Sequence, residues 1–220
     1  MSTPLERFEK IRSTSACTFA APSRLSSLPE WRADASIGEN LKGHIAALES
    51  LCTSAGDTEI DGIVLEAPGA FGRSVDDLAD FVGEVVHIIV ANDPAGGKCL
   101  DEPIERPGWW LTFAGMELFI LAFAPCYPRN HSRWSGDVGS VFLLIQPRAA
   151  FARRRRPGRD TLGQSVRRAI RLRFADRGMD YDVTLAESAI EAHQFVKPMA
   201  SGDPPVRWWV THQERTGVVA

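Results

Sequence analysis

The chain has 220 residues, of which 44% are hydrophobic, and a formal net charge of −3. That length supports one sizeable core, and the negative balance argues against a general nucleic-acid binder. The longest uncharged apolar run, Leu118–Pro125, is far shorter than the roughly 20 residues that cross a bilayer. The N-terminal residues mix acidic and basic side chains and lack the apolar core of a secretory signal. We therefore expect a cytoplasmic protein without a membrane anchor.

The first half of the chain alternates helical and strand patterns. Apolar residues recur about every fourth position over 36–52, which is typical of an amphipathic helix. Residues 61–66 predict a short buried strand. Ser74 is a good N-cap for a second helix that continues to Asn92.

The second half is richer in strand patterns. Aromatic and branched residues predict strands over 109–113, 117–123 and 140–146, and Ala114-Gly115 fits a tight hairpin turn between the first two. Apolar positions from Thr161 to Phe174 predict a third helix with arginines on its other faces. Residues 206–211 suggest a last strand, although Pro204-Pro205 before it weakens this interpretation.

This order of elements predicts an α+β (mixed α/β) fold, with a mixed or antiparallel sheet flanked by helices. We expect a single domain over residues 1–220, with a flexible C-terminal tail from about residue 199. Four cysteines lie far apart without a C-x-x-C pair, which predicts reduced thiols rather than disulfides or structural zinc. They are Cys17, Cys52, Cys99 and Cys126.

An ordered series of motifs resembles the YqcI/YcgG family. The series comprises Ala16-Cys17-Thr18-Phe19-Ala20, Trp109-x-x-x-Phe113-x-Gly115-x-Glu117-Leu118-Phe119, Ala124-Pro125-Cys126-Tyr127-Pro128 with Ser132-Arg133, Gln146-Pro147-Arg148-x-x-Phe151, and Arg168-x-x-Ile170-Arg171. The resemblance covers roughly residues 15–197. The sequence departs from the family pattern at Ser15-Ala16, at the Arg153–Arg156 run and at Glu191-Ala192-His193, and these departures bear on the substrate.

The resemblance implies a heme-dependent N-oxygenase (a monooxygenase-type oxidoreductase). Such an enzyme would bind heme b, use dioxygen and an external reductant, and oxidise an amino or guanidino nitrogen of an amino-acid-like substrate. The alternatives are a non-catalytic heme sensor or carrier, and a cofactor-free domain that binds an anion or a partner.

A heme enzyme needs an iron ligand, an apolar slot and cations for the propionates. His131, in a loop with two arginines and aromatic residues, is the expected iron ligand. His87, His44 and Cys126 are the alternatives, and for the two helical histidines a hydrogen bond to a backbone carbonyl is the simpler interpretation.

The remaining expected site residues come from the same central segment. Tyr127 and Arg129 are the candidates for catalytic groups, although packing is the commoner role for such a tyrosine. Arg133 and Arg148 are expected to bind propionates, and Trp109 and Phe113 to contact the cofactor. Ion pairs with Asp137 or Glu117 are the structural alternative for the arginines.

Two features in the last third of the chain have more than one interpretation. The Arg153–Arg156 run fits a solvated loop better than a nucleic-acid patch, because no aromatic residues are interleaved with it. Trp208, Trp209 and the apolar end Val218-Val219-Ala220 would suit either a homodimer contact or an edge strand.

Overall fold

A five-stranded mixed sheet forms the centre of the protein, in a computed structural model that describes residues 2–54, 60–152 and 164–211. The strands lie in the order β1-β2-β5-β4-β3, with β1 and β2 parallel and every other neighbouring pair antiparallel. Their bounds are β1 Leu25–Ser27, β2 Gly62–Ala67, β3 Leu111–Phe113, β4 Met116–Phe123 and β5 Val141–Pro147. The expected α+β fold is confirmed.

The helices are α1 Pro4–Thr14, α2 Ile37–Ser54, α3 Val75–Ala91, α4 Arg148–Ala152, α5 Gln164–Asp176 and α6 Val183–Ala186. The predicted N-cap at Ser74 is confirmed, since its side chain accepts a hydrogen bond from the Asp77 amide. The hairpin between β3 and β4 turns at Ala114 and Gly115, whose φ angles of 50° and 73° are those of a primed hairpin turn.

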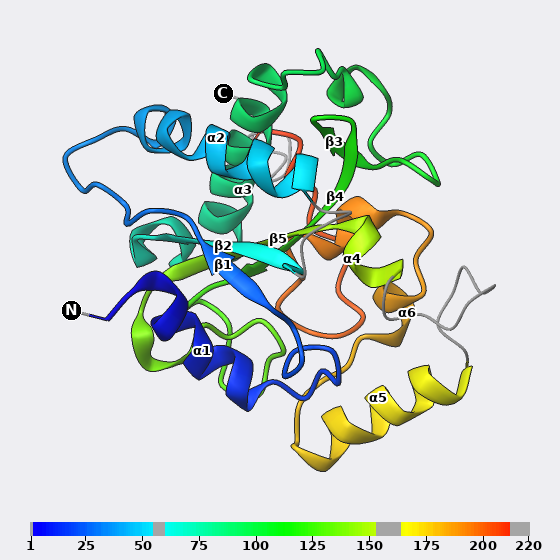
Figure 1. Ribbon diagram of the computed structural model, residues 1–220. Coiled ribbons are helices and arrows are strands. Elements are labelled where there is room, and N and C mark those ends of the chain that lie inside the picture. Colours follow the sequence, from blue (N-terminus) through cyan, green and yellow to red (C-terminus); the bar gives the residue numbers. More distant parts are fainter. Residues whose placement is uncertain (1, 55–59, 153–163, 212–220) are drawn as a thin grey trace, which may run out of the picture.

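The two faces of the sheet are covered differently (Figure 1). Helices α2 and α3 pack on one face over the main core, which includes Leu65, Ile120 and Leu143. On the other face α1 covers a smaller cluster, in which Phe8 lies 5.5 Å from Phe123 between ring centres. The second face is therefore only partly covered by a helix.

The N-terminal helix α1 was not among the predicted elements, although the sequence contains its signal. Thr3 and Glu6 form a capping box, in which each side chain accepts a hydrogen bond from the other residue's backbone amide. Pro4 occupies the first turn, where its missing N–H costs nothing. Strand β1 was missed because its three residues, Leu-Ser-Ser, carry no apolar run.

The predicted strand over 206–211 is wrong: these residues form turns and irregular structure. Trp208 is buried instead, stacking on Phe195 at 5.2 Å between ring centres and donating its indole N–H to the Ala192 carbonyl at 2.8 Å. Packing of Trp208 thus holds this segment in place. Strand pairing is disfavoured here because Pro204 and Pro205 have no backbone N–H to donate.

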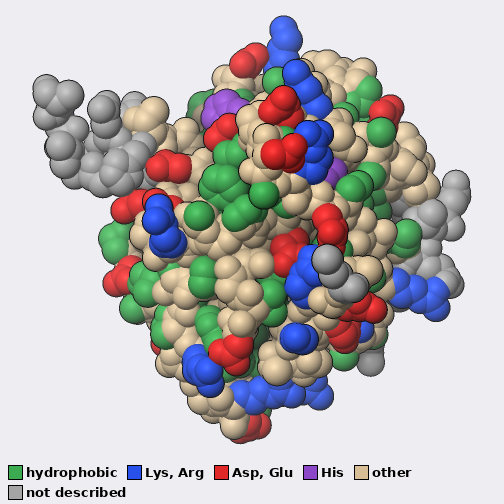
Figure 2. Space-filling model, turned by 90° about the vertical axis from the view of Figure 1, so that its left-hand side faces the viewer, with side chains coloured by type: hydrophobic (Ala, Val, Ile, Leu, Met, Phe, Trp, Pro, Cys, Tyr) green, Lys and Arg blue, Asp and Glu red, His purple; other side chains and the backbone are tan. Residues whose placement is uncertain are grey.

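The surface carries both signs of charge. Figure 2 shows Lys and Arg side chains intermingled with Asp and Glu side chains on one face. Among the described residues, no helix combines the length and apolarity required to cross a bilayer. The Arg153–Arg156 run, the first residues of the predicted third helix and Val218–Ala220 lie outside the described residues.

Candidate functional site

A cavity of about 300 Å³ lies against the sheet face that α1 only partly covers. Its floor is formed by side chains of β4 and β5, and its walls by α1, residues 15–23, α5 and the segment 181–197. A volume of this size is at the lower end of the range for small-molecule sites.

The register of the sheet explains why the floor is apolar. Phe119 pairs with Gln146, Leu121 with Leu144 and Phe123 with Phe142, and alternate residues of a strand share a face. The walls add further aromatic rings from distant parts of the chain. They are Phe8, Phe19, Phe174 and Tyr181.

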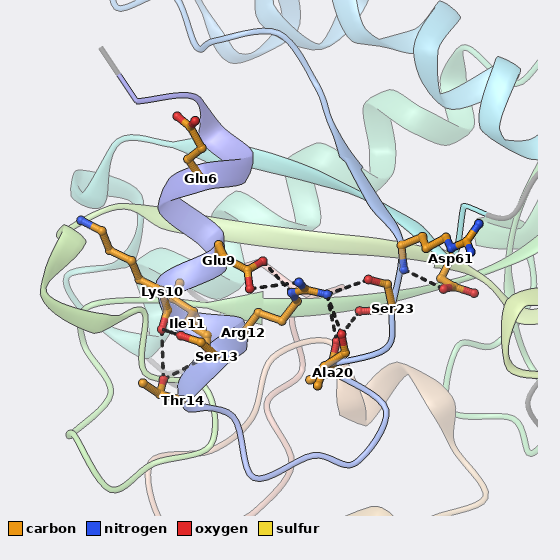
Figure 3. A network of polar contacts seen from close by, with 12 residues as sticks. Glu6, Glu9, Lys10, Ile11, Arg12, Ser13, Thr14, Ala20, Ser23 and Asp61 are labelled. Atoms are coloured by element: carbon orange, nitrogen blue, oxygen red, sulfur yellow. Dashed lines mark hydrogen bonds and ion pairs between the residues drawn. The ribbon is translucent and has the colours of Figure 1, made fainter.

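Arg12 fastens the loop that forms one wall of the cavity to α1 (Figure 3). Its guanidinium donates to the carbonyl oxygens of Ser23 at 2.7 Å and Ala20 at 3.3 Å, and it pairs with Glu9 at 2.7 Å. Because these bonds hold residues 15–23 in place, they also position Cys17, which borders the cavity.

Arg133 is one of two buried cations that line the cavity. Its side chain donates to the carbonyl oxygens of Gln194 at 3.0 Å and Ala122 at 3.5 Å, and lies 5.4 Å from the centre of the Phe123 ring. Among the described residues no carboxylate pairs with it, and burial lowers the pKa of the guanidinium to about 10. A guanidinium has five N–H donors, so some remain for a ligand.

Lys197 is the second buried cation. Its backbone carbonyl accepts a 2.7 Å hydrogen bond from the Tyr127 hydroxyl, which fixes this part of the chain, and its ammonium lies 5.9 Å from the centre of the Tyr181 ring. Burial and the positive charge of Arg133 lower the pKa of the lysine to about 7, against a smaller opposing effect of Asp182. The Asp182 carboxylate caps α6, accepting from the Leu185 amide.

A more polar group of side chains also borders the cavity, at the edge where β2 begins. Gln146 donates to the backbone carbonyl of Asp61 at 3.2 Å, and the Asp61 carboxylate accepts from the Arg24 amide at 2.8 Å. Asp61 is the acidic side chain among the described residues that line the cavity.

His131 lies outside this cavity, beside a separate void of about 10 Å³ that Lys197 also borders. Its ring stacks on Tyr127 at 4.2 Å, its Nδ1 accepts from the Arg133 amide at 3.1 Å, and it also hydrogen-bonds the backbone of Pro198. Burial and the charges of Lys197 and Arg133 lower its pKa to about 4. The neutral His131 ring therefore holds the conformation of the loop that contains Arg133.

Tyr127 and Cys126 pack in the interior of the protein rather than at the cavity. The tyrosine is 2% exposed, and burial raises its pKa, so the phenol is neutral. Burial likewise raises the pKa of the Cys126 thiol to about 11. Neither residue borders the cavity.

Arg129 and Arg148 make the surface ion pairs given above as the structural alternative. Arg129 pairs with Asp137 at 2.8 Å, and Arg148 pairs with Glu117 at 2.6 Å. Neither arginine lines the cavity, so of the three arginines expected at the site only Arg133 does.

The other expected residues lie in or on the opposite layer. Trp109 and Phe113 are fully buried in the core cluster that includes α3. His87 is exposed, and its Nδ1 bonds the Gly83 carbonyl at 2.8 Å. His44 is buried, its Nδ1 has no hydrogen-bond partner among the described residues, and burial lowers its pKa.

The sequence analysis did not identify Lys197 or the role of Cys17 in the cavity. The signal for the lysine was its position within the apolar run Phe195-Val196-Lys197-Pro198, where a charge is unusual. The signal for the cysteine was the Ala16–Ala20 motif.

Comparisons with known proteins give no relative from which a role for this site could be taken. No cluster of three metal-ligating side chains occurs among residues 2–54, 60–152 and 164–211. No family model, no curated protein and no solved structure matches the chain. The resemblance to the YqcI/YcgG family therefore remains a prediction without support from these comparisons.

Proposed function

We propose that the cavity binds a small organic acid with an apolar body. The observation that carries this proposal is that Arg133 and Lys197, both less than 10% exposed, line one apolar cavity without an ion pair to a carboxylate of the described residues. Burying a charge is unfavourable unless a counter-charge accompanies it. A ligand carboxylate would supply that counter-charge.

The shape and chemistry of the cavity narrow the ligand class. Aromatic and aliphatic side chains of the floor favour a hydrocarbon body, and about 300 Å³ suits a branched chain or a single ring. Arg133 offers the planar donors that match a carboxylate. Gln146 and Asp61, which also border the cavity, offer partners for a second polar group of the ligand.

The test is isothermal titration calorimetry with 4-methylpentanoate and its uncharged analogue 4-methylpentanamide. We expect the acid to bind and the amide to bind about 10- to 100-fold more weakly, because a charge-assisted hydrogen bond contributes about 1.5–3 kcal/mol. Lys197→Met should weaken acid binding by a similar factor. Lys42→Met, at an exposed position on α2, is the matched control and should leave it unchanged. Equal affinity for acid and amide would refute the proposal.

A second candidate is the heme b-dependent N-oxygenase that the resemblance implies. One observation favours it: a thiol, Cys17, lines the same apolar cavity as the two cations. A cysteine thiolate is an iron ligand in one class of heme enzymes, and Arg133 and Lys197 could bind propionates. The donors thus fit heme in kind, with Cys17 in place of His131, whereas the volume is small for a macrocycle and the walls would have to separate.

When bound, heme would supply the activation of dioxygen. The chain's own residues would bind and orient an amino-acid-like substrate whose amino or guanidino nitrogen is oxidised. An external reductant would deliver the electrons, and its source lies outside this chain.

Hemin titration followed by visible absorption tests this second candidate. We expect a Soret band with the unmodified protein and with His131→Ala, and a changed band with Cys17→Ser. Loss of the band in His131→Ala alone would instead assign the iron to His131. No band at stoichiometric hemin would refute heme binding and leave acid binding intact, whereas a six-coordinate iron inert to dioxygen would indicate a sensor or carrier.

A further inference from the structure

Lys197 differs from the other lysines of the described chain in its surroundings. It is 8% exposed, whereas Lys10, Lys42 and Lys98 are exposed or half-buried. It borders the cavity, and its ammonium lies 5.9 Å from the centre of the Tyr181 ring. Its side chain therefore lies at the wall of a cavity large enough for a small molecule.

Two features of this environment favour the neutral amine. The first is burial, and the second is the fixed positive charge of Arg133, which makes no ion pair of its own among the described residues. Both lower the pKa of Lys197, to about 7, which raises the share of free amine at neutral pH far above that of an exposed lysine. A lysine in an apolar pocket next to another cation is a recognised form of activated amine nucleophile.

We propose that Lys197 forms an imine with the carbonyl group of a small 2-oxo acid bound in the cavity. This inference rests on the proposed function, because the carboxylate of the ligand must be held by Arg133 for its neighbouring carbonyl carbon to meet the lysine nitrogen. Arg133 keeps its full charge at neutral pH and binds the carboxylate, while the amine acts as the nucleophile.

The step balances without an oxidant or a reductant. The lone pair of Nζ attacks the carbonyl carbon, and a proton moves from nitrogen to the former carbonyl oxygen to give a carbinolamine. Loss of water then breaks the C–O bond and leaves a C=N bond to Lys197. The apolar floor beneath the ligand favours the release of water from the cavity, and rehydration reverses the step.

The substrate class follows from the two anchoring residues and the floor. A 2-oxo acid places its carboxylate and carbonyl on adjacent carbons, which suits neighbouring Arg133 and Lys197 side chains, and its side chain would lie on Phe119, Leu121 and Leu144. A branched aliphatic 2-oxo acid such as 4-methyl-2-oxopentanoate fits this description.

The test is reductive trapping of the full chain with 4-methyl-2-oxopentanoate and sodium cyanoborohydride at pH 7, followed by intact mass and peptide mapping. Hydride reduces the imine to a stable secondary amine. We expect one adduct, on Lys197, formed at least about tenfold faster than on exposed Lys42, because an ordinary lysine is less than about 1 in 1,000 neutral at this pH. The matched acid 4-methylpentanoate, which lacks the carbonyl, should bind without forming an adduct and should compete with labelling.

The outcomes separate this inference from the proposed function. If 4-methylpentanoate binds but the 2-oxo acid gives no adduct on Lys197, the imine is refuted and acid binding stands. If neither acid binds and labelling is spread evenly over exposed lysines, both proposals fail. Lys197→Met, checked for folding by circular dichroism, should lose the adduct, and survival of a single dominant adduct in that variant would also refute the assignment.

Discussion

Replacing Lys197 by methionine should make the protein more stable, by an amount that depends on pH. Methionine is also unbranched, is one atom shorter, and removes a buried charge that has no ion pair among the described residues. The pKa of Lys197 falls from 10.5 to about 7 on folding, which corresponds to about 5 kcal/mol at about 1.4 kcal/mol for each pH unit. The full penalty for burying the charge applies below pH 7, where both the folded and the unfolded chain carry it.

The sign follows from proton binding. Between about pH 7 and pH 10.5 the unfolded chain binds a proton that the folded chain has released, so the stability of the unmodified protein rises with pH. Lys197→Met lacks this term. Its advantage over the unmodified protein should therefore be largest at pH 6 and should shrink by up to about 1.4 kcal/mol for each pH unit between pH 7 and pH 9.

Urea denaturation of both proteins at pH 6, 7, 8 and 9 measures this difference directly. Taking the difference between two proteins cancels the titration of the cysteines and other groups that they share, apart from those coupled to the lysine. Lys42→Met is the control, since this side chain is exposed on α2. A stability difference for Lys197→Met that stays constant over these pH values would refute the claim that burial lowers the pKa of the amine to about 7.

Three further predictions concern the structure around the site. Tyr127→Phe leaves the buried carbonyl of Lys197 without its donor and should lower the free energy of unfolding by about 1–3 kcal/mol, measured in urea, and an unchanged midpoint would contradict this. Gly83→Ala places a Cβ 2.6 Å from a backbone oxygen of the C-terminal segment and should cost about 1–3 kcal/mol, whereas Gly43→Ala, with open space around it, should stabilise by about 0.5–1 kcal/mol; thermal melts that show the same sign for both would be inconsistent with this packing. His44→Leu removes a buried ring nitrogen that has no partner among the described residues and should stabilise the protein by about 1 kcal/mol, so a lower melting temperature would show that the nitrogen has a partner.

Residues with strong local patterns were predicted correctly. The apolar stripe of α2, the N-cap of α3 and the turn at Ala114-Gly115 all depend on neighbours within a few positions in the sequence. The last strand was predicted wrongly because Trp208 and Trp209 have high strand propensity, while the actual position of Trp208 depends on contacts with Ala192 and Phe195.

The arginines of the site also show which features depend on local sequence and which depend on tertiary contacts. Arg129, Arg133 and Arg148 are equivalent as sequence features, since each follows an apolar strand within a loop or helix start. In the folded chain two of them meet Asp137 and Glu117 at the surface, and only Arg133 enters the cavity. The stacked pair Tyr127 and His131 turns the loop inward, and this arrangement has no local sequence signal.

The sequence by itself determined the α+β class, most of the central elements and the segment from which Arg133 comes, because periodicity, capping and turn chemistry act over a few residues. Only the tertiary structure decided that Cys17, Arg133 and Lys197, which lie up to 180 positions apart in the chain, line one cavity. The pairing of β4 with β5 and the incomplete cover of α1 over that face created the space. Burial within it, rather than residue type, is what distinguishes Lys197 from the exposed lysines.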